Sequence, residues 1–264
     1  MITRTTRFAV ALATSLAAVA SAAAPARAAD PVRINVTTAH SALKLFVGDD
    51  GRLYESGYGA ARENYEFPKK LNRQEEFYPQ YGDGFISEPA LQITHADGNT
   101  STSLTYVKHE TSESDPNIAV TRIELKDNAY PFTVTLVLKA YRNEDLIEQW
   151  SEIRHDESGP VMMHRYHSAA PNFRAKEYFL SQFGGDYKRE ATIAEEKLTP
   201  GIKVLDSKIG VRASRYRIPS VIIALDGPAQ EESGEVIAAS LCWSGSFQIE
   251  AELDWQNRLR VLAG

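Results

Sequence analysis

The chain has 264 residues, of which 43% are hydrophobic and 24% are charged, the composition of an ordinary globular protein. Its 29 Lys+Arg and 35 Asp+Glu give a formal net charge of −6, so it lacks the basic excess with which proteins bind nucleic acids or anionic membranes. The single cysteine, Cys242, excludes an intrachain disulfide and a multi-cysteine metal site. It lies in the apolar run Ile237–Trp243, which predicts that its side chain is buried.

The first 28 residues have the features of a secretory signal peptide. Arg4 and Arg7 form a positive start, an Ala-rich apolar stretch follows, and Ala26-Arg27-Ala28 fits an A-x-A cleavage site. The apolar stretch is shorter than the roughly 20 residues that a membrane-spanning helix needs. We therefore expect residues 1–28 to be removed, and a secreted or periplasmic protein with one domain over residues 29–264.

Short apolar runs separated by turn residues follow. Gly48–Gly51 separates two such runs, and Asp97-Gly98 supplies a tight turn between Leu91–Thr94 and Leu104–Val107. Apolar residues alternate most regularly over Phe132–Tyr141, as in a strand with one buried face. Further strands are predicted over Leu146–Ile153, Val161–His167, Val221–Leu225, Glu235–Trp243, Phe247–Leu253 and Leu259–Leu262.

Helical periodicity is rare in this sequence. Only Arg189–Leu198 could form two or three helical turns. Strands spaced this closely, with few helices between them, predict stacked antiparallel sheets. The sequence therefore predicts an all-β fold in a single domain.

The common catalytic signatures are missing, among them G-x-S-x-G, H-E-x-x-H, the P-loop and G-x-G-x-x-G. His164 and His167 could suggest a metal-binding pair, but residues three apart on a strand point to opposite faces, which favours two ordinary histidines. Paired carboxylates could serve glycoside hydrolysis, yet solvated surface acids explain the doublets better. These doublets are Glu75-Glu76, Glu195-Glu196 and Glu231-Glu232. We expect no catalytic residue, metal or cofactor.

The segment Phe77–Phe85 is unusual because it holds several aromatic residues and a carboxylate in a glycine-rich loop. Aromatic rings stack on the apolar faces of sugars, and carboxylates accept hydrogen bonds from sugar hydroxyls. Tyr81, Asp83 and Phe85 are therefore candidate carbohydrate contacts. The alternative is that these aromatic rings close the end of a hydrophobic core, and composition leaves the two open. The tryptophans raise the same question and are more typical of a core: Trp150, Trp243 and Trp255.

Colinear segments from about residue 45 to the last residue, among them Glu76–Phe85 and Phe183–Glu190, resemble the N-terminal domain of glycoside hydrolase family 36, the α-galactosidases. Glu76–Phe85 resembles the G-x-G-D-[FW] loop of that family, and Phe183–Glu190 resembles its G-[DN]-W-x-[RK]-E motif, with Tyr187 in place of Trp. Ser246 stands where Asn is usual, which indicates a divergent branch. Other similar segments are Glu88–Leu91, Asp145–Trp150, Ser207–Gly210, Gly234–Val236, Trp243–Phe247 and Arg260–Gly264.

The resemblance implies a fold, and it implies that catalysis belongs to a different domain. The fold is a β-supersandwich of the galactose-mutarotase type with few short helices. Catalysis in the family belongs to two aspartates of a (β/α)8 barrel, which needs roughly 250 residues with alternating strands and helices. No such alternation occurs here, so we expect no catalytic aspartate in this chain. Whether the chain is itself an enzyme stays open.

The leading hypothesis is a non-catalytic N-terminal domain of a secreted α-galactosidase-like enzyme. It would pack against a barrel present in cis or in trans, and Tyr81, Asp83 and Phe85 would contact an α-galactoside. A homo-oligomer is a further option. Two alternatives remain: a stand-alone carbohydrate-binding protein that uses the same loop, and an aldose-epimerase-like enzyme. The last needs an acid and a base in one pocket, which the opposed faces of His164 and His167 make difficult.

Overall fold

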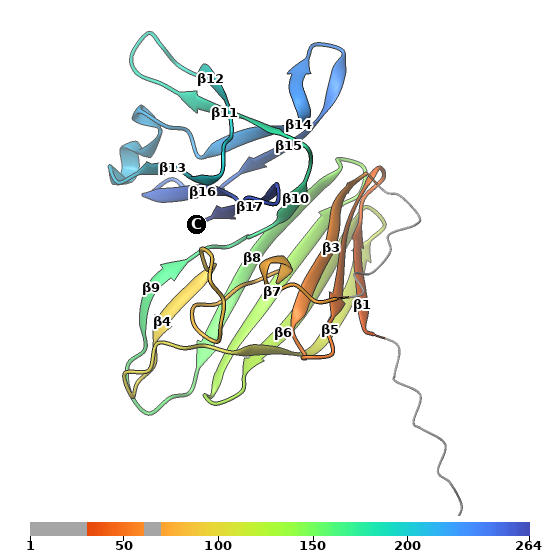
Figure 1. Ribbon diagram of the computed structural model, residues 1–264, viewed down its shortest axis with the longest axis vertical. Coiled ribbons are helices and arrows are strands. Elements are labelled where there is room, and N and C mark those ends of the chain that lie inside the picture. Colours follow the sequence, from red (N-terminus) through yellow and green to blue (C-terminus); the bar gives the residue numbers. More distant parts are fainter. Residues whose placement is uncertain (1–30, 61–69) are drawn as a thin grey trace, which may run out of the picture. The chain divides into compact units, whose positions relative to one another are not determined.

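The computed structural model describes residues 31–60 and 70–264, so the predicted signal peptide lies outside the described residues. These residues form seventeen strands and two short 3₁₀ helices (Figure 1). Every strand pair among them is antiparallel, which confirms the predicted all-β class with antiparallel sheets. In the described part of the chain, no helix has the length and hydropathy required to cross a membrane.

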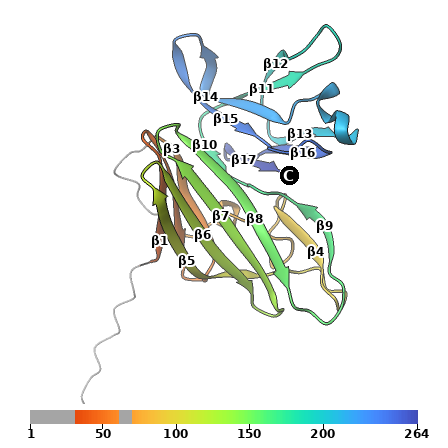
Figure 2. The same ribbon diagram turned by 180° about the vertical axis from the view of Figure 1, so that it is seen from behind.

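Strands β1 to β9 form the first half of the domain. One sheet has the order β1-β2-β3, a second has the order β5-β6-β7-β8, and β4 pairs with β9. Figure 2 shows β5 to β8 side by side as one layer. The bounds are β1 Arg33–Thr37, β2 Ser41–Val47, β3 Leu53–Ala60, β4 Leu91–Thr94, β5 Leu104–Asp115, β6 Ile118–Asp127, β7 Phe132–Tyr141, β8 Leu146–His155 and β9 Met162–Tyr166.

A hydrophobic core joins these sheets. Strand β7 contributes every second residue to it, because alternate side chains of a strand point to the same face. Phe132, Val134 and Leu136 are at most 1% exposed, as their alternation predicts. Leu45 of β2 and Ile93 of β4 lie in the same core, so it is built by all three sheets.

Strands β10 to β17 form the second half. Its sheets have the orders β10-β17-β16-β13 and β12-β11-β14-β15, and a second core lies between them, with Leu180 and Ile249 among its members. The bounds are β10 Asn172–Arg174, β11 Tyr178–Gly184, β12 Thr192–Lys197, β13 Gly201–Ser207, β14 Ser220–Gln230, β15 Ser233–Ser240, β16 Phe247–Leu253 and β17 Arg258–Ala263. The 3₁₀ helices are η1, Arg73–Glu75, and η2, Gly210–Arg215.

Two local predictions were wrong. Arg189–Leu198 does not form a helix, because Thr192–Lys197 is strand β12 and pairs with β11. Lys188 and Ala191 have φ values of 64° and 54°, which a right-handed helix cannot contain. Cys242 is exposed instead of buried, because β15 ends at Ser240 and the chain then turns, with the Trp243 amide donating to the Leu241 carbonyl.

The tryptophans are more exposed than a core position predicts. Trp255, in the turn between β16 and β17, is 90% exposed, and Trp243 is 61% exposed. Trp150 is half-buried, and its indole N–H donates to the Glu152 carboxylate at 3.3 Å. None of the three is a fully buried core residue.

Candidate functional site

The segment Phe77–Phe85 follows η1 and separates its aromatic side chains into two groups. Phe77 and Tyr78 are at most 1% exposed and belong to the first core. Tyr81 is 44% exposed, and the Asp83 side chain is 43% exposed. Phe85 is only 9% exposed, with the Arg260 guanidinium 5.7 Å from its ring centre. Both interpretations of the sequence therefore apply to different residues: the early rings close the core, and Tyr81 and Asp83 face solvent.

Three consecutive residues of this loop have left-handed backbone conformations. Gly82, Asp83 and Gly84 have φ values of 95°, 49° and 80°. A Cβ atom on Gly82 would lie 2.6 Å from the Ser101 Cα atom, so the loop can approach the segment between β4 and β5 this closely only because this residue is glycine. Aspartate is one of the few other residues that tolerate the left-handed region.

The Asp83 carboxylate is held from one side. Its Oδ2 atom pairs with the Arg52 guanidinium and accepts a hydrogen bond from the Ser103 hydroxyl at 2.9 Å. Among the described residues, no hydrogen bond or ion pair reaches Oδ1. The main chain of Asp83 is also fixed, since its carbonyl accepts from Arg73 at 2.9 Å and its amide donates to the Ser101 hydroxyl at 3.1 Å. Asp83 therefore presents one oxygen in a fixed orientation.

Arg52 is the centre of a buried polar network beneath the loop. It is 6% exposed and lies 3.4 Å from the Glu76 carboxylate and 3.4 Å from the Gln80 side-chain oxygen. Gln80 donates to Glu76 at 2.5 Å, and its oxygen accepts from the Leu104 amide at 2.9 Å. Burial raises the pKa of Glu76, while Arg52 and Arg73 act against that rise. The network connects the turn before β3, the loop and β5.

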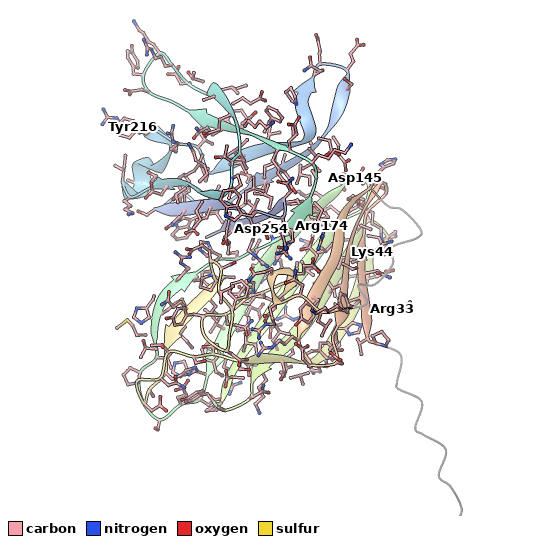
Figure 3. All side chains as sticks on the ribbon, viewed as in Figure 1. Arg33, Lys44, Asp145, Arg174, Tyr216 and Asp254 are labelled. Carbon is pink, nitrogen blue, oxygen red and sulfur yellow. The ribbon has the colours of Figure 1, made fainter. Side chains whose placement is uncertain are left out.

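A second arginine connects the loop to the second half of the domain. Arg260 of β17 donates to the carbonyl groups of Glu76 at 3.1 Å, Gln74 at 2.7 Å and Ala170 at 3.1 Å. Burial lowers the pKa of Arg260 to about 10. Arg174, labelled in Figure 3, lies at the end of β10. It forms an ion pair with Glu75. Of the acidic doublets, Glu75-Glu76 is therefore a pair of buried structural acids and not a solvated surface feature.

Sequence reasoning singled out Tyr81, Asp83 and Phe85 but did not indicate the arginines that contact Asp83 and Phe85. Arg52 is separated from Glu76 and Asp83 by 24 and 31 residues, so no local spacing could reveal the network. The only signal for Arg260 was its place in a segment that resembles a family motif, and nothing in that segment indicated which residues it would contact.

An imidazole and a carboxylate also lie close to each other directly after the end of β9. The His167 Nε2 atom lies 4.0 Å from Glu250 of β16, and both side chains are at most 3% exposed. Burial lowers the pKa of His167 to about 4, and Arg165 adds to this effect. His164, by contrast, is exposed and bonds to Thr94 at 2.7 Å. Since both His167 and Glu250 are buried, they do not supply the accessible acid and base that an epimerase needs.

A third group has the order of a catalytic triad. Glu157 contacts His95 Nδ1 at 2.8 Å, and His95 Nε2 lies 3.3 Å from the Thr102 hydroxyl. Thr102 is 1% exposed, however, so no substrate can reach its hydroxyl. The group instead holds the turn after β4 to the turn after β8. Within residues 31–60 and 70–264, no three His, Cys, Asp or Glu side chains are placed to hold a metal ion.

The architecture defines an antiparallel all-β domain, and comparison with known proteins assigns it to a family. Residues 32–264 match the family model of the glycosyl hydrolase family 36 N-terminal domain. The chain therefore belongs to the family of glycoside hydrolase family 36 N-terminal domains.

Known relatives of the chain are α-galactosidases. Alpha-galactosidase AgaA of Geobacillus stearothermophilus is 26% identical over 201 residues, which cover 71% of this chain and 27% of that protein. Alpha-galactosidase 2 of Hypocrea jecorina is 23% identical over 284 residues, which cover 96% of this chain and 38% of that protein. The chain thus spans about a third of the length of these relatives.

Solved structures of α-galactosidases have the same fold. The structure of AgaA from Geobacillus stearothermophilus aligns with a TM-score of 0.81 and 21% identity, over 88% of this chain and 37% of that one. The α-galactosidase from Lactobacillus brevis aligns with a TM-score of 0.79 and 21% identity, over 89% of this chain and 36% of that one. At this identity the likeness concerns the fold.

Proposed function

We propose that the chain is the non-catalytic N-terminal domain of a secreted α-galactosidase-like glycoside hydrolase. It packs against a (β/α)8 catalytic barrel, present in cis or in trans, and contacts an α-galactoside through Tyr81, Asp83 and Phe85. The finer fold we propose is a β-supersandwich of the galactose-mutarotase type, in which the sheets of each half stack on a core. The active enzyme is an assembly of such chains.

The observation that carries the sugar contact is the geometry of Asp83. Its carboxylate is held through Oδ2, and no hydrogen bond or ion pair within residues 31–60 and 70–264 uses Oδ1, so this oxygen can accept from a sugar hydroxyl. Tyr81 lies two residues away and is 44% exposed, so its ring can stack on a sugar face. Phe85 is buried further and contributes only through the small part of its ring that remains accessible. The relatives support the substrate class, since AgaA variants have been solved with raffinose and stachyose.

Calorimetry with galactose tests the sugar contact. The purified chain should bind galactose at millimolar concentrations, and Asp83→Asn should weaken binding about tenfold, because it removes the charge from a hydrogen-bond acceptor. Asp49→Asn, an exposed aspartate in the turn between β2 and β3, is the matched control. Equal affinities for all three proteins, or no heat of binding, would contradict the proposal.

Two further measurements separate the alternatives. The chain should not hydrolyse an aryl α-galactoside, and appreciable turnover would show that it carries catalytic residues of its own. It should not accelerate the mutarotation of fresh α-galactose, and acceleration would favour an epimerase. A stand-alone carbohydrate-binding protein would bind galactose as above without stimulating a barrel added in trans. Mass spectrometry of the exported protein tests the removal of residues 1–28.

A further inference from the structure

A hollow of about 430 Å³ in the surface lies close to the Tyr81–Phe85 loop. It is lined by β5 and by the turn between β6 and β7, with Thr105, Lys126, Asn128 and Tyr130 among its residues. Its volume lies within the roughly 300–1,000 Å³ of small-molecule sites. Neither the sequence motifs nor the contacts described above account for it.

Ser103 connects this hollow to Asp83. Its hydroxyl donates to the Asp83 Oδ2 atom at 2.9 Å and accepts from the Asn128 side-chain amide at 3.3 Å. The Arg52 guanidinium donates to the same hydroxyl at 2.9 Å. The carboxylate of the loop and an amide of the hollow are therefore each one hydrogen bond from a single atom. Groups this close can contact neighbouring rings of one oligosaccharide.

The floor of the hollow is rigid. The Asp127 carboxylate is 4% exposed and accepts from the backbone amides of Ser103 at 2.6 Å, Ala129 at 2.8 Å and Tyr130 at 2.9 Å. The backbone N–H of Asn128 donates to the Ser103 carbonyl at 3.1 Å. Asp127 thus organises the turn and is not itself offered to a ligand. A preorganised turn loses little entropy when a ligand binds.

The remaining polar groups suit neutral hydroxyls. The Asn128 side-chain oxygen accepts from Thr105 at 2.9 Å. Since one N–H of its side-chain amide donates to Ser103, the second N–H is left for a ligand. The Lys126 ammonium makes no hydrogen bond or ion pair within residues 31–60 and 70–264 and can donate to hydroxyl oxygens. One lysine beside a buried carboxylate, in a chain with a net charge of −6, does not suit a phosphate or another anion. The mixture of amide, hydroxyl and ammonium is that of a sugar site.

We propose that this hollow is a second sugar subsite, which holds the unit next to the galactose in an α-galactoside oligosaccharide. The proposal rests on the sugar contact by Asp83 and deepens it, because it makes this domain a determinant of substrate length. A trisaccharide such as raffinose spans both Asp83 and the hollow, whereas galactose occupies only one.

Calorimetry of the full chain with galactose and with raffinose tests this. The unmodified chain should bind raffinose about tenfold more tightly than galactose, the value expected for one or two added hydrogen bonds. In the double variant Lys126→Ala/Asn128→Ala this ratio should fall toward one. Lys126→Met alone, which changes an exposed side chain, should lower the ratio in the same direction. The matched control Lys208→Ala/Asn35→Ala alters exposed residues elsewhere and should keep the ratio.

The outcomes distinguish the two proposals. A ratio near one in the unmodified chain, or an unchanged ratio in both Lys126 variants, overturns the second subsite and leaves the Asp83 contact intact. A tight raffinose complex that Asp83→Asn does not weaken overturns the Asp83 contact. Absence of binding with either sugar overturns both. Thermal unfolding of each variant shows whether the fold is retained.

Discussion

The two halves of the domain place their polar and apolar side chains differently. The first half, β1 to β9, buries charged side chains beneath the Tyr81–Phe85 loop, with Arg52 and Glu76 at most 6% exposed. The second half, β10 to β17, leaves large apolar side chains in solvent, among them Val211 at 93% and Tyr187 at 81%. Burial of charged groups fixes the loop in the first half at a cost in stability, and the second half leaves these apolar side chains accessible to solvent.

The largest effect is expected from breaking the buried network of the first half. Arg52→Met leaves Glu76 buried with less compensation for its charge and should lower the free energy of unfolding by about 3–5 kcal/mol. Arg122→Met is the matched control, because its partner Glu152 is exposed and such pairs contribute about 0–1 kcal/mol. Urea titrations measure both. Similar losses for the two variants would show that burial of the network does not matter.

The next effect concerns two buried groups where the halves meet, which respond to pH in opposite directions. Burial raises the pKa of Glu55 to about 7, so the fold favours the protonated carboxyl group. The contribution of Glu55 to the free energy of unfolding is therefore largest below pH 4.5 and is lost as the pH rises toward 7. The pKa of His167 is lowered to about 4, so stability is lost as the pH falls from 6.5 toward 4. Each group changes the free energy of unfolding by up to about 3 kcal/mol, and between pH 4.5 and 6.5 the two changes have opposite signs.

Variants at these two positions separate the slopes. In Glu55→Gln, stability should rise with pH from 4.5 to 6.5 more steeply than in the unmodified chain. In His167→Gln, it should fall over the same range. Chemical unfolding at several pH values measures both slopes. If neither variant alters the pH dependence, the two groups titrate alike in the folded and unfolded states.

The third effect concerns the loop backbone and is of similar size. Gly82→Ala places a Cβ against the Ser101 backbone and should cost more than the conformational strain alone, about 2–4 kcal/mol. Gly98→Ala is a matched control with nearly the same φ, 91°, but no atom within 4 Å of its Cβ, so it should cost about 1–2 kcal/mol. Equal losses of stability in the two variants, measured by thermal unfolding, would mean that the Ser101 segment shifts to accommodate the new methyl group.

The sequence predicted the regular parts of the fold and singled out the loop of the candidate site, but it left open which of the loop residues are exposed. The alternation over Phe132–Tyr141 reports directly on burial, because a strand repeats every two residues. It failed at β12, where Glu195, Glu196 and Lys197 favour a helix and pairing with β11 overrides them. It failed at Arg52 because a buried network joins residues far apart in the chain, and no period or spacing encodes such contacts.

The smallest effect concerns the exposed apolar side chains of the second half. Val211→Ser should change the free energy of unfolding by less than about 0.5 kcal/mol, since the side chain is 93% exposed. It should nonetheless reduce self-association and binding of a hydrophobic dye, because Val211 lies between the exposed Ile209 and Tyr216 in the chain. Ile86→Ser, at 88% exposure in the first half, is the control and should leave both unchanged. Sedimentation and dye fluorescence measure the difference. An equal reduction in both variants would mean that the apolar surface does not distinguish the halves.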